Sequence, residues 1–387
     1  MSEFGLYIHV PYCKSVCPYC DFNVVPNRAE GTTQWEDFFR ALTHEWDSRR
    51  ALFKGRLRTI YWGGGTPSLA PCEKIATFMD HVRDTVEVSE GLEISLEADP
   101  GTVTLQYLQG LRAAGVNRLS LGWQSNDDGL LKVIGRGHRS RENREVLELA
   151  RQAGFENISV DFMFGIPGQT MGALQKNLAE VVDLAPEHVS LYALTYHEGT
   201  PFEAWRRSGR VRPVEHDVEA EMMERIERAL VEAGYEHYEV SNFGRPGFRS
   251  KHNHAYWTGV PYLGVGPGAN SFLPGERRRW EGIRKPRAYG EYWGELKETR
   301  LPEAGDESCE WAETLAPKQL ISEQLMVGLR TSDGVDLGRF ELEEREGEIE
   351  GAVVEALERG WVRREGEKIV PTPLGMRFAD SLAELFF

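Results

Sequence analysis

Short β-type segments alternate with amphipathic helical segments over the first 200 of the 387 residues. Six segments have the β-branched and aromatic composition of strands, and they begin at Leu6, Thr59, Leu92, Arg118, Ile158 and His188. Helical periodicity marks the segments between them, such as 33–46, 102–115, 141–154 and 171–184. Strands that alternate with helices form parallel sheets that the helices cover. The pattern therefore predicts an α/β fold with six βα units, curved into a partial (βα)6 barrel that does not close.

Polar side chains stand at the ends of three of these strands: Glu97, Gln124 and Asp161. In βα barrels the ligand sites gather at the carboxyl ends of the strands. A single polar residue at a strand end is often only a turn former or a helix cap. Three of them in one sheet favour a binding site at this rim.

The pattern changes after residue 200, where an acidic helix leads into a stretch rich in glycine, proline and aromatic residues. The last 27 residues read as a two-strand wing followed by a helix, counted from Trp361 to Phe387. We predict two domains, the partial barrel over 1–235 and a mostly helical, winged-helix-like domain over 236–387. We expect the winged module to pack against the barrel, because a fold alone does not assign DNA binding.

The charge balance excludes broad classes of partner. The chain carries 45 basic and 61 acidic residues, a net charge of −16, which repels a phosphate backbone. We therefore predict no nucleic-acid partner. No run of about 18 apolar residues is present, and the first ten residues lack the features of a signal peptide. These observations predict a cytoplasmic protein.

Three of the five cysteines, Cys13, Cys17 and Cys20, lie within eight residues directly after the first predicted strand. Cysteines crowded in this way in a cysteine-poor chain indicate a metal site more than a disulfide framework. Three thiolates can each bind one iron of a cubane and leave the fourth iron without a protein ligand. A zinc site would need further ligands, and Cys72 and Cys309 are isolated from one another and from histidine pairs. A redox pair of Cys17 and Cys20 would leave Cys13 unused.

The spacing Cys-x3-Cys-x2-Cys after the first strand of a partial barrel resembles the radical S-adenosylmethionine (SAM) superfamily. The motifs YIHVPYC, CPYCDF, GGGTPS, VDFMFGIPGQT and KHNHAYW resemble the HemN/HemW group within it, and most closely the HemW family. The likeness covers essentially the whole chain and is strongest over 7–268. It implies a [4Fe-4S] cluster on Cys13, Cys17 and Cys20, SAM as a cofactor and haem as cargo, with no residue assigned a catalytic role.

The same resemblance places nine residues at SAM-contact positions: Tyr7, Tyr19, Gly64, Gly65, Thr66, Glu97, Gln124, Arg136 and Asp161. From the residues alone, Gly64, Gly65 and Thr66 are expected to expose amides and a hydroxyl suited to an amino-acid head group. Two consecutive glycines also often mark a plain turn. Thr66 stands where the superfamily has an acidic residue. Tyr19 resembles an adenine-contacting residue, and the alternative is a packed loop aromatic.

The stretch HNHAYW matches the His-Asn-x-x-Tyr-Trp signature of HemW-like proteins, and it implies haem contacts by His252, Asn253, Tyr256 and Trp257. By this likeness His252 is an axial ligand, and the aromatic pair stacks on the macrocycle. The alternative is a hydrogen-bonded packing element that docks the second domain. His9, His138 and His254 are competing candidates for the ligand.

The resemblance implies a haem chaperone that passes haem to an acceptor haemoprotein. The alternative is an oxygen-independent coproporphyrinogen III oxidase, which forms protoporphyrinogen IX by radical decarboxylation. Phe22 stands where the oxidases carry a further cysteine, and only twelve residues precede Cys13 where they carry a long extension. Both departures favour the chaperone, and whether the chain is an enzyme stays open. Further implied partners are an electron donor such as flavodoxin or ferredoxin, and a membrane touched peripherally through the acceptor.

Overall fold

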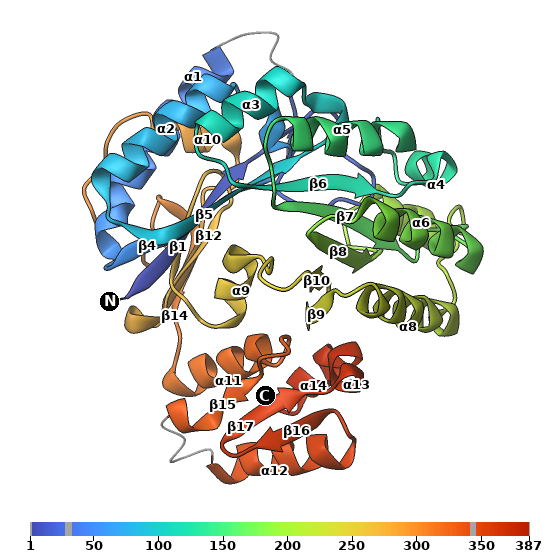
Figure 1. Ribbon diagram of the computed structural model, residues 1–387. Coiled ribbons are helices and arrows are strands. Elements are labelled where there is room, and N and C mark those ends of the chain that lie inside the picture. The colour runs from blue at the N-terminus through green and yellow to red at the C-terminus, as the bar shows by residue number, and fades with distance from the viewer. Residues whose placement is uncertain (1, 28–32, 341–345, 387) are drawn as a thin grey trace.

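One large curved sheet organises the molecule. The computed structural model describes residues 2–27, 33–340 and 346–386. Among these, twelve strands form a single sheet in the order β14-β13-β12-β11-β1-β4-β5-β6-β7-β8-β10-β9. Helices cover its outer face, and a smaller module lies beneath it (Figure 1).

Six neighbouring parallel strands form the centre of the sheet. They are β1 (Glu3–Val10), β4 (Arg56–Gly64), β5 (Val88–Ala98), β6 (Arg118–Gln124), β7 (Ile158–Phe164) and β8 (His188–Ala193). Each contains or overlaps one of the six predicted strands. The predicted partial barrel of parallel strands is therefore confirmed.

Strands from the later part of the chain extend both edges of this barrel. Beside β1 lie β11 (Tyr262–Val265), β12 (Asn270–Leu273), β13 (Arg278–Gly282) and β14 (Cys309–Thr314); beside β8 lie β10 (Asn242–Gly244) and β9 (Glu236–Glu239). A separate pair, β2 (Tyr12–Cys13) and β3 (Val25–Pro26), brackets the cysteine loop. The sequence analysis did not predict these strands, which are two to six residues long.

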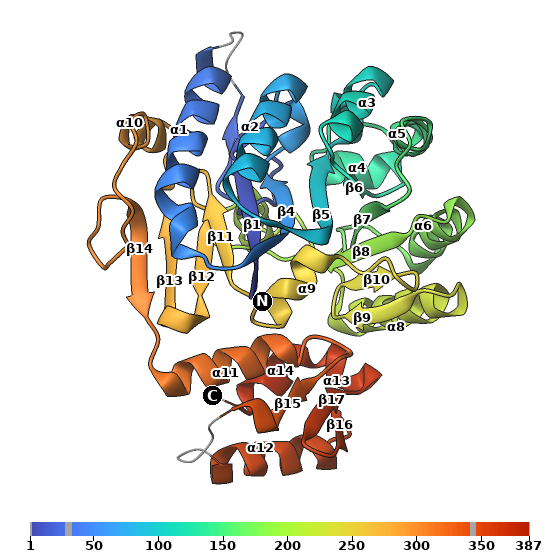
Figure 2. The same ribbon diagram turned by 60° about the vertical axis from the view of Figure 1, so that its left-hand side comes forward.

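The longer helices of the barrel lie side by side on the outer face of the sheet (Figure 2). They are α1 (Thr33–Arg49), α2 (Cys72–Thr85), α3 (Leu105–Ala113), α5 (Ser140–Gln152), α6 (Met171–Leu184) and α8 (His216–Glu232). Shorter helices are α4 (Asp128–Val133), α7 (Pro201–Arg207), α9 (Lys251–Trp257) and α10 (Pro286–Tyr292). Turns of 3-10 helix occur at 50–52, 67–69, 100–102, 274–276 and 337–339. The four predicted helical segments correspond to α1, α3, α5 and α6.

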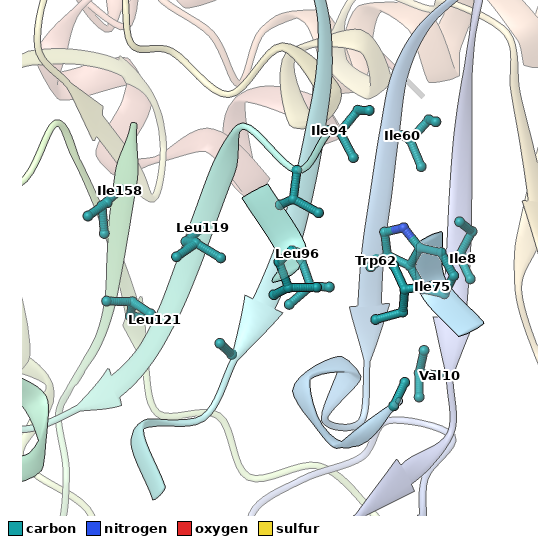
Figure 3. Close-up of a cluster of buried hydrophobic side chains, with 14 of the residues drawn as sticks. Ile8, Val10, Ile60, Trp62, Ile75, Ile94, Leu96, Leu119, Leu121 and Ile158 are labelled. Carbon is teal, nitrogen blue, oxygen red and sulfur yellow. The ribbon is translucent and has the colours of Figure 1, made fainter. Parts of the chain in front are cut away.

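The strands are apolar on the face that meets the helices. Ile8, Ile60, Leu96 and Leu119 are at most 2 % exposed and pack in one cluster with the helix residue Ile75 (Figure 3). Because side chains alternate across a strand, the other face carries the residues between these positions. Those residues are largely polar, and they line the inside of the barrel.

The C-terminal module has its own sheet and core. It comprises α11 (Pro317–Gly328), β15 (Val335–Asp336), α12 (Glu346–Glu358), β16 (Val362–Glu365), β17 (Lys368–Pro371), α13 (Pro373–Arg377) and α14 (Ala379–Glu384). The antiparallel pair of β16 and β17 confirms the predicted wing, and β15 adds a third strand. The predicted last helix is divided into α13 and α14.

The domain boundary predicted after residue 235 stays a prediction. Strands β9 to β14, within 236–314, belong to the barrel sheet, whereas the separate core of the module comprises residues from Leu325 to Phe386. Helix α9 lies between the sheet and the module in both views (Figures 1 and 2). Within the described ranges, no helix is both long enough and apolar enough to cross a membrane.

Candidate cofactor site

A cavity of about 490 Å³ opens at the carboxyl ends of the barrel strands. The three clustered cysteines line it, together with eight of the nine predicted SAM-contact residues: Tyr19, Gly64, Gly65, Thr66, Glu97, Gln124, Arg136 and Asp161. Most of these residues come from the cysteine loop and from the ends of β4, β5 and β6, with Arg136 following α4. Glu97 and Gln124 lie at the strand ends, as expected, whereas Asp161 lies in the middle of β7 and lines the cavity from there. We refer to this cavity as the rim pocket.

The three thiols are positioned as a set by the loop between β1 and α1. None of them forms a disulfide. Burial raises the pKa of the Cys20 thiol to about 11, and the neighbouring Cys17 and Cys13 add to this shift. Burial likewise raises the pKa of Cys13. Thiolates crowded in this way need a positive partner, which bound iron supplies.

No three histidine, cysteine, aspartate or glutamate side chains of the described residues converge closely enough to hold a single metal ion. A cubane does not require such convergence, because each thiolate binds a different iron at a corner of the cluster. The donor set of three free thiols lining one cavity fits a multinuclear iron–sulfur cluster.

The glycine loop after β4 is fitted closely against the cysteine loop. Gly64 has φ +106°, and a Cβ there would lie 2.6 Å from the ring of His9. A Cβ on Gly65 would approach the carbonyl oxygen of Tyr12 to 2.8 Å. Glycine is therefore needed at both positions for the approach of the two loops.

The expectation that this loop exposes its amides is wrong. The amide of Gly65 donates to the Val10 carbonyl at 2.7 Å, and the amide of Thr66 donates to the Tyr12 carbonyl at 2.8 Å. The amide of Gly64 donates to Glu97 Oε2 at 3.2 Å. All three amides are used to hold the cysteine loop and β5 in place. The loop's ligand contacts, which stay a prediction, would use side-chain and carbonyl atoms.

Two half-buried carboxyl groups, those of Glu97 and Asp161, line the rim pocket. Burial raises the pKa of Glu97 to about 7, and the hydrogen bond that Tyr61 donates at 2.8 Å opposes this shift. Burial also raises the pKa of Asp161, although hydrogen bonds from Ser120 at 2.9 and 3.0 Å lower it. A ligand that brings positive charge or hydroxyl donors would favour the ionised form of both groups.

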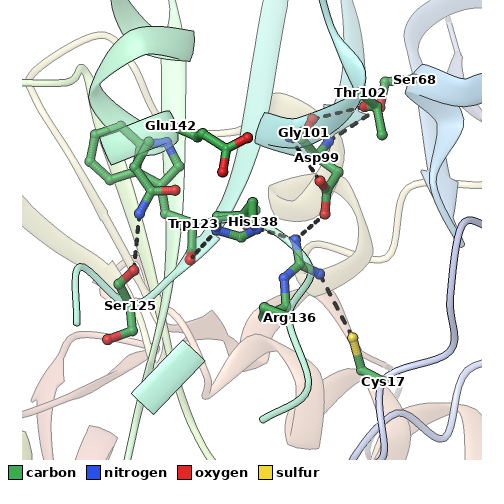
Figure 4. A network of polar contacts seen from close by, with 12 residues as sticks. Cys17, Ser68, Asp99, Gly101, Thr102, Trp123, Ser125, Arg136, His138 and Glu142 are labelled. Atoms are coloured by element: carbon green, nitrogen blue, oxygen red, sulfur yellow. Dashed lines mark hydrogen bonds and ion pairs between the residues drawn. The ribbon is translucent and has the colours of Figure 1, made fainter. Parts of the chain in front are cut away.

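Arg136 connects the pocket wall to the cysteine loop (Figure 4). It forms an ion pair with Asp99 and donates to the Gly122 carbonyl at 3.0 Å. Its Nη1 lies 3.9 Å from Cys17 Sγ. Asp99 also lines the pocket, and the sequence analysis did not single it out. The signal that points to it is its place directly after β5, two residues beyond Glu97.

Gln124 reaches the pocket through an irregularity at the end of β6. Its φ is +62°, an uncommon value for a residue other than glycine, and the register of β6 against β7 shifts between Leu121 and Gln124. Such bulges redirect side chains next to functional sites. The sequence carried no sign of this shift.

The two predicted tyrosines differ in position. Tyr19 lines the pocket, and its ring meets Phe202 edge-on at 6.4 Å between centroids. Tyr7 does not line the pocket. Its hydroxyl shares a 3.0 Å hydrogen bond with His9 Nδ1, and its ring lies 6.4 Å from the ring of His252. Tyr7 therefore lies beneath the pocket, between the rim and α9.

The predicted haem-contact residues lie apart from the rim pocket, on α9. His252 is 1 % exposed, with Nδ1 bonded to Thr59 Oγ1 and Nε2 bonded to Tyr256 Oη, each at 2.7 Å. Its ring stacks on Tyr61 at 5.0 Å, and burial lowers its pKa to about 3. Both ring nitrogens are occupied, so this arrangement favours the packing alternative.

The other residues of this segment are also held by protein contacts. Tyr256 meets Tyr262 edge-on at 4.6 Å, and Trp257 lies under the guanidinium of Arg330 at 5.5 Å. The Asn253 amide donates to the hydroxyl of the capping Ser250. His252, Tyr256 and Trp257 thus connect β4 and β11 to the C-terminal module, and the contact of all four residues with haem stays a prediction.

The competing histidines occupy three different environments. His9 Nε2 bonds to the Asn23 carbonyl at 2.9 Å, and His254 Nε2 pairs with Asp333 at 2.7 Å. Only His138 of the three lines the rim pocket, and its Nε2 lies 3.2 Å from the Trp123 carbonyl.

Comparison with known proteins identifies both parts of the chain. Residues 7–181 match the radical SAM superfamily, and residues 315–378 match the HemN C-terminal domain. "Heme chaperone HemW" of Lactococcus lactis is 35% identical over 87% of this chain and 83% of its own length. The protein of the same name from Mycobacterium tuberculosis is 33% identical over 98% of this chain and 94% of its own length. The structure of coproporphyrinogen III oxidase (HemN) from Escherichia coli, a radical SAM enzyme, superposes with a TM-score of 0.82 over 100% of this chain and 90% of that one. At 23% identity this last likeness shows the fold alone.

Proposed function

Since the chain belongs to the HemW family of the radical SAM superfamily, we propose that it is a haem chaperone that binds a [4Fe-4S] cluster, SAM and haem. The observation that carries this proposal is the rim pocket, where the three cysteines and eight predicted SAM-contact residues line one cavity. The relatives named as haem chaperones match most of this chain.

In the proposed site, Cys13, Cys17 and Cys20 hold three irons of the cluster. The bound cluster supplies an open iron for SAM and an electron for its cleavage. Arg136 places a positive charge 3.9 Å from Cys17 Sγ, beside the proposed cluster. The paired amides of the glycine loop keep the cysteine loop fixed to β4.

Glu97 and Asp161 are the proposed acceptors for the donors of SAM. SAM carries a sulfonium and an ammonium group, so two half-buried carboxyl groups that line one pocket are suited to it. Arg136 and Gln124, which line the same pocket, are proposed to contact its carboxylate and ribose. Tyr19 is proposed to contact the adenine.

For haem, the family signature at His252, Asn253, Tyr256 and Trp257 remains the predicted contact. Coordination by His252 requires that its bond to Thr59 or its bond to Tyr256 break, because both ring nitrogens are occupied and one of them must bind the iron. The apolar side chains at the mouth of the rim pocket offer haem a second surface. Val16 is 41% exposed and Phe22 is 64% exposed, and both line the pocket.

The test is a haem titration of the full-length protein followed by its Soret absorption. The chaperone proposal expects a saturable spectral change at micromolar haem, and its absence contradicts the proposal. The same titration on His252→Ala, with exposed His216→Ala as the control, decides whether the signature histidine is the ligand. A changed Soret spectrum in the first variant alone assigns the ligand to His252.

The oxidase alternative is tested by an anaerobic assay with SAM, reductant and coproporphyrinogen III. Formation of protoporphyrinogen IX would overturn the chaperone proposal. The acceptor haemoprotein, a flavodoxin or ferredoxin electron donor and a peripheral membrane contact are proposed partners. A cytoplasmic location is proposed with them.

A further inference from the structure

A second cavity, of about 270 Å³, lies between α1, α10 and the connection to β14. Ser48 and Arg49 at the end of α1, Tyr292 and Trp293 at the end of α10, and Lys297 and Arg300 in the following loop line it. None of these residues lines the rim pocket. The family's chemistry therefore leaves this cavity unexplained.

Arg49 is the residue that makes this cavity unusual. Its side chain is 2% exposed, it donates from Nη2 to the Ser308 carbonyl at 2.7 Å, and its Nε lies 3.5 Å from Glu45. The guanidinium lies over the ring of Trp293, 5.1 Å from the centroid. Among the described residues, buried Nη1 has no hydrogen-bond partner. A buried cationic donor without an acceptor is costly, since such groups are nearly always paired.

Trp293 presents a second donor of the same kind. It is 2% exposed, and within the described chain its buried Nε1 also has no hydrogen-bond partner. Two orphan donors thus belong to residues that line the same cavity and are in contact with each other. Each lacks an acceptor, and a single ligand rich in acceptor oxygens would satisfy both.

The charges around the cavity favour an anionic ligand. Lys297 and Arg300 add to Arg49, and Glu298 also lines the cavity. Lys297 lies 3.9 Å from the exposed Glu295, and Arg300 pairs with Asp306 at 2.6 Å. These ion pairs reduce the positive charge around the cavity. The buried guanidinium of Arg49 has its carboxylate partner, Glu45, on the Nε side, so among the described residues its Nη1 still has no hydrogen-bond partner.

We propose that this cavity binds a small oxyanion, a carboxylate or a phosphate, through Arg49 Nη1 and Trp293 Nε1, with Lys297 adding positive charge. The bound ion ties the end of α1 to α10 and to the chain that leads into β14. Because the ion would bind only the folded protein, it stabilises the fold by mass action.

The test measures thermal stability and binding heat of the full-length protein with sodium phosphate, with sodium malonate and with sodium chloride at one ionic strength. Phosphate or malonate is expected to raise the melting temperature above that in chloride. A response to one anion alone assigns the class, and no response to either overturns the proposal.

Variants locate the response in the cavity. Arg49→Ala is unsuitable because it leaves Glu45 buried without its cation. Trp293→Phe removes the N–H donor and keeps an aromatic ring beside Arg49, although the ring is smaller than indole. Lys297→Gln removes one charge. Each variant is expected to weaken binding about fivefold or more, as for the loss of one hydrogen bond. Arg287→Gln on exposed α10 surface, 91% exposed, is the matched control and should bind as the parent does. Equal binding by the parent and both cavity variants, or equal weakening by the control, overturns the site.

Discussion

The rim pocket and helix α9 both contain polar side chains that are hydrogen-bonded within the protein, but only those of the pocket border a cavity. In the pocket, the half-buried Glu97 and Asp161 accept hydrogen bonds from neighbouring hydroxyl groups, and both carboxyl groups line the cavity. On α9, the buried His252 and the half-buried Tyr256 are bonded to each other at 2.7 Å, and neither lines the cavity. A carboxylate has about four lone-pair sites and can accept from a ligand as well as from the protein, whereas both ring nitrogens of His252 are already used. The difference teaches that an internal hydrogen bond alone does not separate packing from binding, and that a bordering cavity with a spare acceptor site does.

The largest effect is expected from the cysteines of the rim pocket. Replacing Cys17 with alanine removes one of three iron ligands, so anaerobic reconstitution should yield almost no cluster instead of about four irons per chain. Iron and sulfide analysis measures this. Cys72→Ala, outside the pocket, should keep the full content. Full iron in the Cys17 variant would mean that the pocket does not hold a cubane.

On the other side of the comparison, His252→Ala tests whether α9 is a packing element. The variant loses two buried hydrogen bonds and leaves Thr59 and Tyr256 without their partner. We expect the free energy of unfolding to fall by about 2–5 kcal/mol, measured by denaturant titration without haem. Exposed His216→Ala should change it by less than about 0.5 kcal/mol. An unchanged stability would contradict the packing role.

The pH dependence sharpens this prediction. The pKa of His252 is lowered to about 3 in the folded state, so below pH 6.5 the unfolded chain binds the proton that the folded chain excludes. The parent therefore loses stability as the pH falls from 6.5 towards 3. The free energy of unfolding of the parent exceeds that of His252→Ala, and this difference should narrow over the same pH range, by at most about 1.4 kcal/mol per pH unit. A constant difference would show that His252 titrates normally.

Glu97→Gln should reduce SAM affinity about tenfold, since it removes a charged acceptor from the pocket. The pKa of Glu97 is raised to about 7, so the group is ionised above that pH and protonated below it. In the parent, SAM affinity should therefore fall as the pH is lowered through 7, and in the variant this dependence should weaken. Calorimetric titration of the reconstituted protein with SAM, repeated at several pH values, measures the loss of affinity and its pH dependence. Equal affinity in parent and variant at pH 8 would remove Glu97 from the site.

Glu97 also gives the folded protein a pH dependence opposite to that of His252. Between pH 4.5 and 7 the folded state holds a proton on Glu97 that the unfolded chain releases, so stability falls as the pH rises. The Glu97→Gln variant should lack this contribution in the protein without ligands.

Much of the barrel could be predicted from the sequence because its periodicity is local. The alternation of apolar and polar residues in β1, β4 and β5 reflects one face against helices and one face inside the barrel. The edge strands escaped prediction because strands such as β10 and β12 are only three and four residues long, and β10 pairs with β8, about 50 residues earlier in the chain (Asn242 with Ser190).

The site was predictable only to the level of residue position. Cys13, Glu97 and Gln124 could be placed at the rim because parallel strands end together, whereas Asp161 lines the pocket from the middle of β7. The use of the Gly65 amide by the Val10 carbonyl could not be foreseen, because it depends on how closely two loops approach. The same holds for His252, whose bonding partner Thr59 is 193 residues away.

The smallest effect on the fold is expected from Phe22, which is 64% exposed at the mouth of the rim pocket. Phe22→Ala should change the free energy of unfolding by less than about 0.5 kcal/mol and leave the iron content intact. If haem rests on the mouth of the pocket, this variant should weaken haem binding several-fold, whereas Leu296→Ala, 61% exposed outside the pocket, should not. If Phe22→Ala binds haem as the parent does and His252→Ala binds it more weakly, the haem site is assigned to α9 and not to the pocket mouth. That result would also show that α9 opens to bind haem, since its histidine is otherwise fully bonded.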